Sequence, residues 1–178
     1  MNTDLADKFG NLVSRVLGFV AGRYAGQVPS GGEDTQAETD LHALVNATLA
    51  ELDAAHRRSE VRRAADRVRA LWDIANAYVA NEAPWTVAKT DPERAALVTR
   101  TALGLVRLSA VVAEPFVPQT ARKVLELFGE KNDPAWPFNA REALRIDHTT
   151  TFARPEPLFA KIPAEWALTQ RERFSGTV

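Results

Sequence analysis

Apolar residues recur at intervals of three and four along most of the chain, the spacing that places them on one face of an α-helix. The apolar stripes run over residues 5–20, 41–52, 61–79, 97–113 and 117–128. Segments rich in Gly, Pro, Ser and acidic residues lie between several of them, as expected for loops. The pattern therefore predicts an all-α fold, a helical bundle of about five main helices.

The fourth stripe is apolar nearly all round. Between Leu97 and Ala113 the only charged residues are Arg100 and Arg107, which lie seven positions apart. Pro92 suits the first turn of this helix. Because a helix with such a narrow polar stripe is covered by neighbours on most sides, we expect it at the centre of the bundle.

The regular pattern stops after Gly129. A proline-spaced loop, DPAWPF, is followed by a short helical turn, NAREAL, and then by an extended segment. The apolar residues expected to hold this segment on the bundle are Phe152, Leu158, Phe159 and Ile162. We predict a single domain, with a bundle at 1–130 and a C-terminal tail at 131–178. The tail is expected to pack on the bundle and to end in a short helix from Pro163 to about Phe174.

The third stripe ends at a Pro-Trp pair. Pro84 lacks a backbone donor and forces its predecessor out of the helical conformation, so it must end the helix. Trp85 then lies at an elbow between two helices. A large ring in this place either plugs the top of the bundle or faces outward as a platform.

Composition and charge restrict the classes of partner. The chain has 178 residues, of which 46% are hydrophobic, so it is long enough for one ordinary core. Its net charge of −1 argues against binding DNA mainly through phosphates, and any contact with nucleic acid must be local. No cysteine is present, which excludes thiolate metal sites and fits a reducing compartment. We predict a soluble, cytoplasmic chain with no membrane partner.

The sequence offers no catalytic constellation. His42, His56 and His148 are far apart in the sequence and lack the spacing of a helical metal site. The Gly31-Gly32 pair is followed by acids and is not a phosphate loop. A cofactor or haem bundle would need inward histidine or carboxylate ligands, which the helix faces lack. We therefore predict no catalytic residue, no metal site and no cofactor in this chain.

Asn11 and Arg15 lie one turn apart on the polar face of the first helix. An amide and a planar guanidinium at this spacing could hydrogen-bond the Watson–Crick edge of an unpaired base, and a nearby tryptophan could stack on that base. On a helix such a pair is more often ordinary surface. The residues alone leave both interpretations open.

The third helix is expected to open with HRRSEVRRAADRVR, which crowds six arginines against Glu60 and Asp66. The arginines are Arg57, Arg58, Arg62, Arg63, Arg67 and Arg69. One interpretation is a solvated helix face with intrahelical ion pairs. The other is a local positive patch for a phosphate backbone.

Four ordered motifs resemble one known family. TDLADKFGNLVSR, ANAYVANEAPWTVAK, AEPFVPQTARKVLELFG and PLFAKI, in this order and at these separations, look like the anticodon-binding helical domain of methionyl-tRNA synthetase. The resemblance covers nearly the whole chain. It implies the all-α bundle of that domain and a role in binding the initiator and elongator methionine tRNAs.

The resemblance also implies which residues meet the anticodon. In that family the Asn and Arg of GNL-x-x-R and the Trp of the Pro-Trp motif recognise the first base, the cytosine of CAU. The matching positions here are Asn11, Arg15 and Trp85. Supporting RNA contacts are expected at Lys89, Arg62, Arg69 and Asn76.

The catalytic half of the family is missing from this sequence. Its HIGH and KMSKS signatures and its zinc-binding insertion do not occur here, so ATP and methionine would belong to an absent catalytic domain. We expect either the C-terminal part of a synthetase, which works with that domain in cis or in trans, or a freestanding paralogue. Such a paralogue would bind tRNA or proteins without aminoacylation, and apolar surface near AWPF and PLFAKI would then be exposed.

Overall fold

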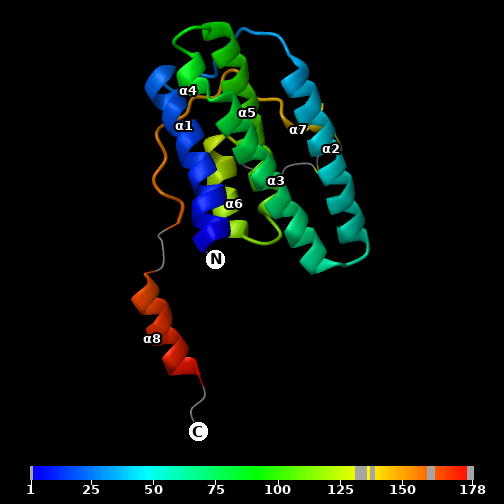
Figure 1. The fold of residues 1–178 in the computed structure, drawn as a ribbon, viewed down its shortest axis with the longest axis vertical. Coiled ribbons are helices and arrows are strands. Elements are labelled where there is room, and N and C mark those ends of the chain that lie inside the picture. Colours follow the sequence, from blue (N-terminus) through cyan, green and yellow to red (C-terminus); the bar gives the residue numbers. More distant parts are fainter. Residues whose placement is uncertain (1, 131–135, 137–138, 160–162, 176–178) are drawn as a thin grey trace.

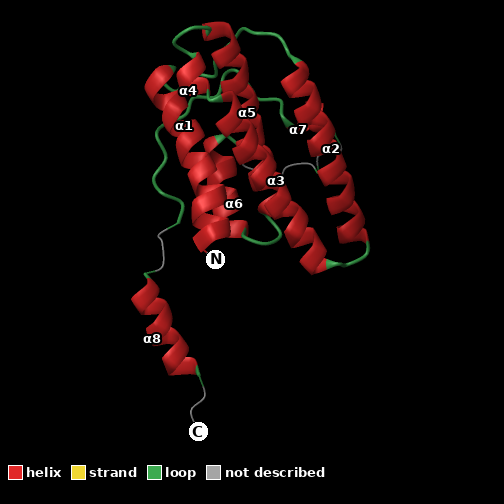
Figure 2. Cartoon of the chain, in the orientation of Figure 1, coloured by secondary structure: helices red, strands yellow, loops and turns green. Residues whose placement is uncertain are grey.

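The computed structural model describes residues 2–130, 136, 139–159 and 163–175. These residues form a helical bundle with an extended C-terminal segment, and no strand is found among them (Figure 2). One isolated antiparallel bridge joins Gln27 to Thr151. The prediction of an all-α fold is confirmed.

Five main helices build the described bundle, and further helices join or follow them (Figure 1). The main ones are α1 (Asn11–Arg23), α2 (Gln36–Arg57), α3 (Val61–Glu82), α5 (Pro92–Ala113) and α6 (Pro118–Leu127). The others are the π-helical η1 (Asn2–Gly10), α4 (Pro84–Val87), α7 (Ala140–Ala143) and α8 (Ala164–Phe174). The helix start predicted at Pro92 is confirmed.

α5 lies at the centre, as its nearly uncharged sequence predicts. It packs on α1, α3, α4 and α6, and its only half-buried positions are arginines. In length and composition it is apolar enough to cross a membrane, but 89% of its most apolar stretch is buried inside the bundle. The apolar character of α5 is therefore that of a core helix.

The turn between α2 and α3 corrects one prediction. The sequence placed the start of the third helix at HRRSEV, but α2 continues through Arg57 and α3 begins only at Val61. Ser59 adopts the left-handed conformation, with φ +56°, and the Glu60 amide donates to the Ala55 carbonyl at 2.9 Å. The tight turn leaves Val61 68% exposed, although its spacing had placed it on the buried face.

The C-terminal tail packs on the bundle over part of its length. Phe152 is buried and meets the ring edge of Phe128 with centroids 4.9 Å apart, and Leu158 and Phe159 are half-buried against the core. Ile162 lies outside the described residues. α8 extends away from the bundle (Figure 1). The packing predicted for the tail is thus seen in residues 139–159 and not in α8, and the division at residue 130 stays a prediction.

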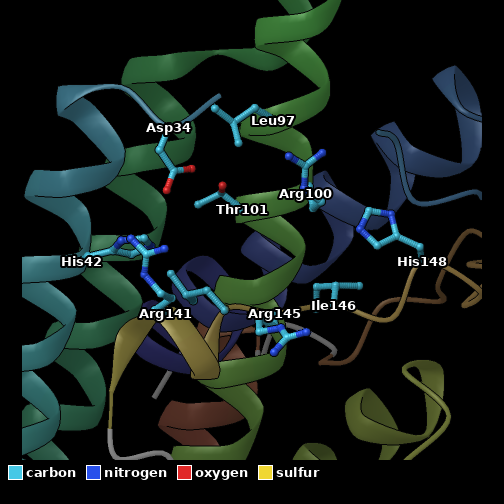
Figure 3. A pocket seen from close by; sticks show the side chains of 10 residues that line it. Asp34, His42, Leu97, Arg100, Thr101, Arg141, Arg145, Ile146 and His148 are labelled. Atoms are coloured by element: carbon cyan, nitrogen blue, oxygen red, sulfur yellow. The ribbon is translucent and has the colours of Figure 1, made fainter. Parts of the chain in front are cut away.

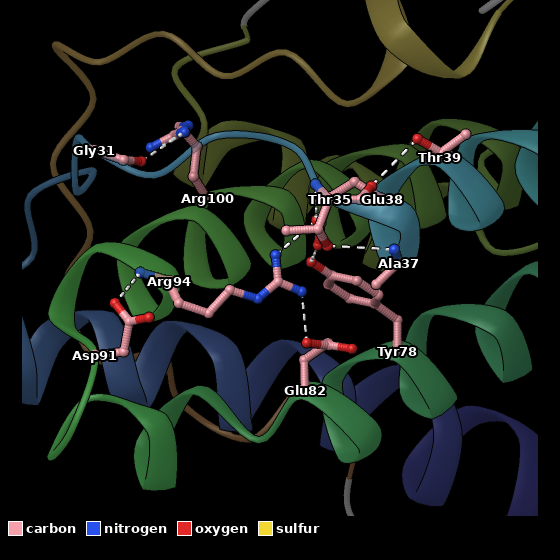
Figure 4. A network of polar contacts seen from close by, with 10 residues as sticks. All are labelled: Gly31, Thr35, Ala37, Glu38, Thr39, Tyr78, Glu82, Asp91, Arg94 and Arg100. Atoms are coloured by element: carbon pink, nitrogen blue, oxygen red, sulfur yellow. Dashed lines mark hydrogen bonds and ion pairs between the residues drawn. The ribbon is translucent and has the colours of Figure 1, made fainter.

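A buried polar network ties α2, α3 and α5 together (Figure 4). Glu38 of α2 is 1% exposed. It accepts hydrogen bonds from the Tyr78 hydroxyl at 2.5 Å and from the Arg94 guanidinium at 2.6 Å. Arg94 also pairs with Glu82, the last residue of α3, at 2.6 Å. The network therefore holds the end of α3, which leads directly into the Pro-Trp elbow.

The same contacts fix the ionisation of Glu38. Burial raises its pKa, but hydrogen bonds from Arg94, Tyr78 and Thr35 together lower it more and hold it at about 2. Burial and the neighbouring Glu38 carboxylate raise the pKa of the Tyr78 hydroxyl. Glu38 is therefore ionised and Tyr78 neutral at physiological pH.

Candidate functional site

Arg15 and Trp85 meet where α1 passes α4. The guanidinium carbon of Arg15 lies 4.6 Å from the centroid of the Trp85 ring. This distance is within the range of a cation–π contact, which is worth about 0.5–1 kcal/mol at an exposed site. Two of the residues singled out in the sequence, 70 positions apart, are therefore brought into direct contact.

The backbone of the elbow places Trp85 at this point. α3 ends at Glu82, and Ala83 adopts a left-handed conformation with φ +36°, which reverses the chain. Pro84 is buried and begins α4, while Trp85 is half-buried against the core. The ring thus combines the two roles considered for it, because one part packs on the bundle and another part remains open.

Phe19 contacts Trp85 as well, although the sequence reasoning did not select it. The two rings meet edge to face, with centroids 6.2 Å apart at 83°, and Phe19 meets Tyr24 in the same way at 5.8 Å and 88°. Phe19 follows Arg15 by four positions, so the helical period that linked Asn11 to Arg15 could have extended the row. The edge contacts of Phe19 restrict how the Trp85 ring can turn.

Asn11 completes the row on α1. Its side chain is exposed and has no hydrogen-bond partner among the described residues. It borders a hollow of about 360 Å³ between α1 and the segment Pro157–Phe159. A Cβ on Gly10 would come within 3.1 Å of the Phe159 ring, so glycine lets this segment lie close to the helix. The amide donor and acceptor of Asn11 are therefore available to a ligand.

Two of the expected supporting residues have different surroundings. Asn76 donates from its amide nitrogen to the Trp72 carbonyl at 2.8 Å and to the Lys8 carbonyl at 3.3 Å. Its amide thus bridges α3 and η1 within the protein. Lys89 is exposed, follows α4 closely, and forms no ion pair with the described part of the chain. Of the two side chains, only that of Lys89 has no partner within the described chain and remains available to a ligand.

The arginines of α3 are mostly paired. Arg69 contacts Asp66 and lies 3.5 Å from Asp4, and Arg67 pairs with Glu51 at 2.9 Å. Arg62 is exposed and has no ion pair within the described ranges. Most of the cluster therefore fits the solvated face with ion pairs.

The arginines also lie far from the Trp85 elbow. Arg69 precedes Glu82 by 13 residues, which is about 20 Å along a helix axis. Any contact between these arginines and a ligand on Trp85 would thus involve a different part of that ligand.

No cluster of metal-ligating side chains accompanies these residues in the described part of the chain. In the part of the chain that the structure describes, no three His, Asp or Glu side chains lie close enough to hold a metal ion. His56 is half-buried between the rings of Phe116 and Trp136, with centroids 6.4 and 5.2 Å away. The side chains described at α1 and α4 can stack on a ligand through the Trp85 ring and hydrogen-bond to it through Asn11 and Arg15.

Comparisons with known proteins agree on one family. The family model for the anticodon-binding domain of methionyl-tRNA ligase matches residues 28–178. The methionine–tRNA ligase of Cereibacter sphaeroides is 42% identical over 177 residues, and that of Streptomyces avermitilis is 40% identical over 179. Each match covers 99% of this chain and 31% of the ligase, so the chain spans about a third of these curated relatives.

Solved structures give the same result. The ligand-free methionyl-tRNA synthetase of Mycobacterium tuberculosis superposes with a TM-score of 0.79 at 26% identity, over 91% of this chain and 33% of that one. The same synthetase bound by methionyl-adenylate gives a TM-score of 0.76 at 27% identity, over 89% and 32% of the two chains.

Proposed function

Since the chain belongs to the family of anticodon-binding domains of methionyl-tRNA ligases, we propose that it reads the CAU anticodon of the initiator and elongator methionine tRNAs. The observation that carries this proposal is the contact between Arg15 and Trp85, with the unpaired amide of Asn11 one turn away. An aromatic ring, a guanidinium and an amide on one side of the bundle supply both parts of single-stranded base recognition: a stacking surface and groups for the base edge.

The hydrogen-bonding inventory favours cytosine as the first base. Arginine can only donate, and cytosine offers acceptors along its Watson–Crick edge. The amide oxygen of Asn11 can accept from the exocyclic amine of cytosine. Uracil would instead turn a ring N–H toward the donors of Arg15 and a carbonyl toward the acceptor of Asn11. The wrong base thus leaves polar groups unpaired, which is the physical basis of selectivity.

Arg15 has two positions in this mechanism. In the free protein its guanidinium lies over the Trp85 ring, where an incoming base would stack. We propose that the base takes this place on the ring while the guanidinium moves to the edge of the base. Phe19 keeps the Trp85 ring in orientation during the exchange through its edge contact.

The ligase reaction itself requires more chain than is described here. Because this chain spans about a third of its relatives, we propose that methionine activation with ATP belongs to a catalytic domain that acts with it in cis or in trans. The domain described here would then contribute discrimination among tRNAs rather than chemistry.

The direct test compares the affinities of the chain for a short RNA hairpin with a CAU loop and for the same hairpin with a UAU loop. Both affinities are measured by fluorescence anisotropy at two salt concentrations. A preference for CAU supports the proposal. Equal binding of the two hairpins, or none at high micromolar RNA with the protein folded, contradicts it.

Replacing Arg15 by alanine is expected to reduce the preference for CAU over UAU by about two- to thirteen-fold, the worth of a typical net hydrogen bond of about 0.5–1.5 kcal/mol. The affinity for the CAU hairpin should fall by a smaller factor than the CAU preference. The substitution also uncovers the Trp85 ring, so the base no longer has to displace the guanidinium before it stacks. The ratio of the two dissociation constants is the measurement. An Arg15→Ala protein that discriminates as well as the parent protein would remove Arg15 from base reading.

Among the α3 arginines, Arg62 is the proposed phosphate contact, because it is exposed and unpaired within the described chain. Arg62→Gln is expected to lower the slope of log affinity against log salt by about 1, the contribution of about one phosphate contact. Arg57→Gln is the matched control, since Arg57, at the end of α2 just before the turn, is exposed but pairs with Asp53 at 2.7 Å. Equal slopes for the two variants would exclude Arg62 as a phosphate contact.

A second candidate function is a protein-interaction module. The described parts of AWPF and PLFAKI do not form the exposed apolar surface expected for it, because Trp136, Leu158 and Phe159 are packed against the core. α8 carries exposed apolar residues instead, with Trp166 54% and Phe174 76% exposed. This alternative would gain support from an absence of hairpin binding together with concentration-dependent association of the chain.

A further inference from the structure

A second polar hollow lies on the bundle between α2, α5 and α7, and the mechanism above does not use it (Figure 3). Its volume is about 230 Å³. The polar and charged side chains that line it are Asp34, His42, Arg100, Thr101, Arg141, Arg145 and His148. We call this set the basic hollow, because three arginines face a single carboxylate.

Arg100 provides a fixed cation in the wall of the basic hollow. One terminal nitrogen donates to the Pro29 carbonyl at 3.0 Å. The other donates to the Gly31 carbonyl at 3.1 Å (Figure 4). Both acceptors are neutral, and no described carboxylate lies within ion-pair distance of the guanidinium. The loop between α1 and α2 therefore orients Arg100 without neutralising its charge.

Arg141 and Arg145 provide two further cations, one turn apart at α7. Both are exposed, and neither forms an ion pair or a side-chain hydrogen bond with the described chain. This differs from Arg94 and Arg107, which both have carboxylate partners. The guanidiniums of Arg141 and Arg145 are therefore available to an anion.

Tight packing keeps α7 beside α5. A Cβ on Gly104 would come within 2.3 Å of the Leu144 carbonyl oxygen, so only glycine allows the end of α7 to lie this close to the central helix. Asn46 of α2 accepts the Ala140 amide at 2.7 Å and fixes the start of α7. The backbone that carries Arg141 and Arg145 is thus held from both sides.

We propose that the basic hollow binds a phosphate group. Arginine forks match the oxygens of a phosphate monoester or diester, and either anion offsets part of the positive charge of three arginines that form no ion pair within the described chain. The imidazoles of His42 and His148 and the hydroxyl of Thr101 supply further hydrogen-bonding groups around it. The phosphate could come from an RNA backbone or from a small phosphorylated molecule, and this site does not depend on the reading of the anticodon.

The test compares the full chain with two double variants of equal charge. Arg141→Gln with Arg145→Gln removes the free cations of the basic hollow. Lys123→Gln with Arg171→Gln removes two exposed charges from α6 and α8, far from it in sequence. Each protein is titrated with inorganic phosphate at constant ionic strength and followed by amide NMR signals, and each is assayed for the salt dependence of hairpin binding.

Two results would support the site and identify its ligand. If phosphate shifts the signals of the 100–101 and 141–146 segments, and the Arg141/Arg145 variant binds it at least five-fold more weakly than the control, the ligand is a small phosphate. If inorganic phosphate does not bind, but that variant alone lowers the salt slope of hairpin binding by about 1–2, the ligand is RNA backbone. Identical behaviour of the two variants in both assays would overturn the proposal. Loss of CAU preference alone would affect only the anticodon proposal.

Discussion

Replacing Glu38 by alanine is expected to lower the free energy of unfolding by about 3–5 kcal/mol, the range for removing one partner of a buried ion pair. Glu38 is 1% exposed and accepts from Tyr78 and Arg94, so its removal leaves a hydroxyl and a guanidinium without their acceptor. It also removes a hydrogen bond to the Thr35 amide at the start of α2. Urea unfolding of the variant and the parent protein measures the difference.

Glu82→Ala is the matched control for this prediction. Glu82 pairs with the same arginine, but its side chain is 24% exposed, so solvent screens the contact and Arg94 keeps Glu38. The cost should therefore be clearly smaller, in the range of about 1 kcal/mol for partly exposed pairs. If the two substitutions cost the same, burial of Glu38 is not what makes the network important.

The pH dependence of stability provides an independent check on Glu38. Its pKa is about 2 in the folded chain, against an ordinary value of 4.5. Because folding depresses the pKa, the stabilisation is complete above about pH 4.5 and is lost as the pH falls toward 2. At about 1.4 kcal/mol per pKa unit the full loss is about 3.5 kcal/mol. Glu38→Ala should lack this part of the acid transition.

The fold could be predicted from the sequence where a local rule was sufficient. The three-four spacing gave the five main helices. The ring of proline, which can begin a helix but not continue one, marked the end of α3 before Pro84 and the start of α5 at Pro92. The turn at Ser59 was missed because serine has no strong preference for a positive φ. Spacing alone therefore continued the third helix backward into α2.

The polar network could not be predicted from the chain. Glu38 and Arg94 are 56 positions apart, and in the sequence Glu38 looks like any acidic residue near the start of a helix. Its burial depends on how α2, α3 and α5 pack, which is a tertiary property. The same holds for the basic hollow, whose cations come from α5 and α7 and the loops beside them.

The candidate site was also predictable only in part from the sequence. Asn11 and Arg15 could be paired from the sequence because residues four apart on a helix are neighbours. Their relation to Trp85 came from the family resemblance, since no periodic rule connects positions 70 apart. The geometry of that contact, with the guanidinium over the ring and Phe19 at its edge, came only with the fold.

Replacing Trp85 by alanine is expected to weaken binding of the CAU hairpin by about 1–3 kcal/mol, the cost of losing one stacking contact between a base and an aromatic ring. Trp85→Phe should recover part of the loss, because a smaller ring still offers a face. Trp166→Ala is the control, since Trp166 lies on α8 and is 54% exposed. Unchanged affinity in a folded Trp85→Ala protein would exclude stacking on this ring.

Because Arg15 and Trp85 are in contact, we expect that the effects of their substitutions on the free energy of hairpin binding are not additive. In the free protein the guanidinium of Arg15 contacts the Trp85 ring, and the incoming base must break this contact. Removing either side chain therefore also removes the free-energy cost of breaking it. A double-mutant cycle on hairpin binding should then show a coupling of at least about 0.5 kcal/mol, the lower end of an exposed cation–π contact. Strict additivity would mean that the base does not exchange places with Arg15, and the two residues would then act on different parts of the loop.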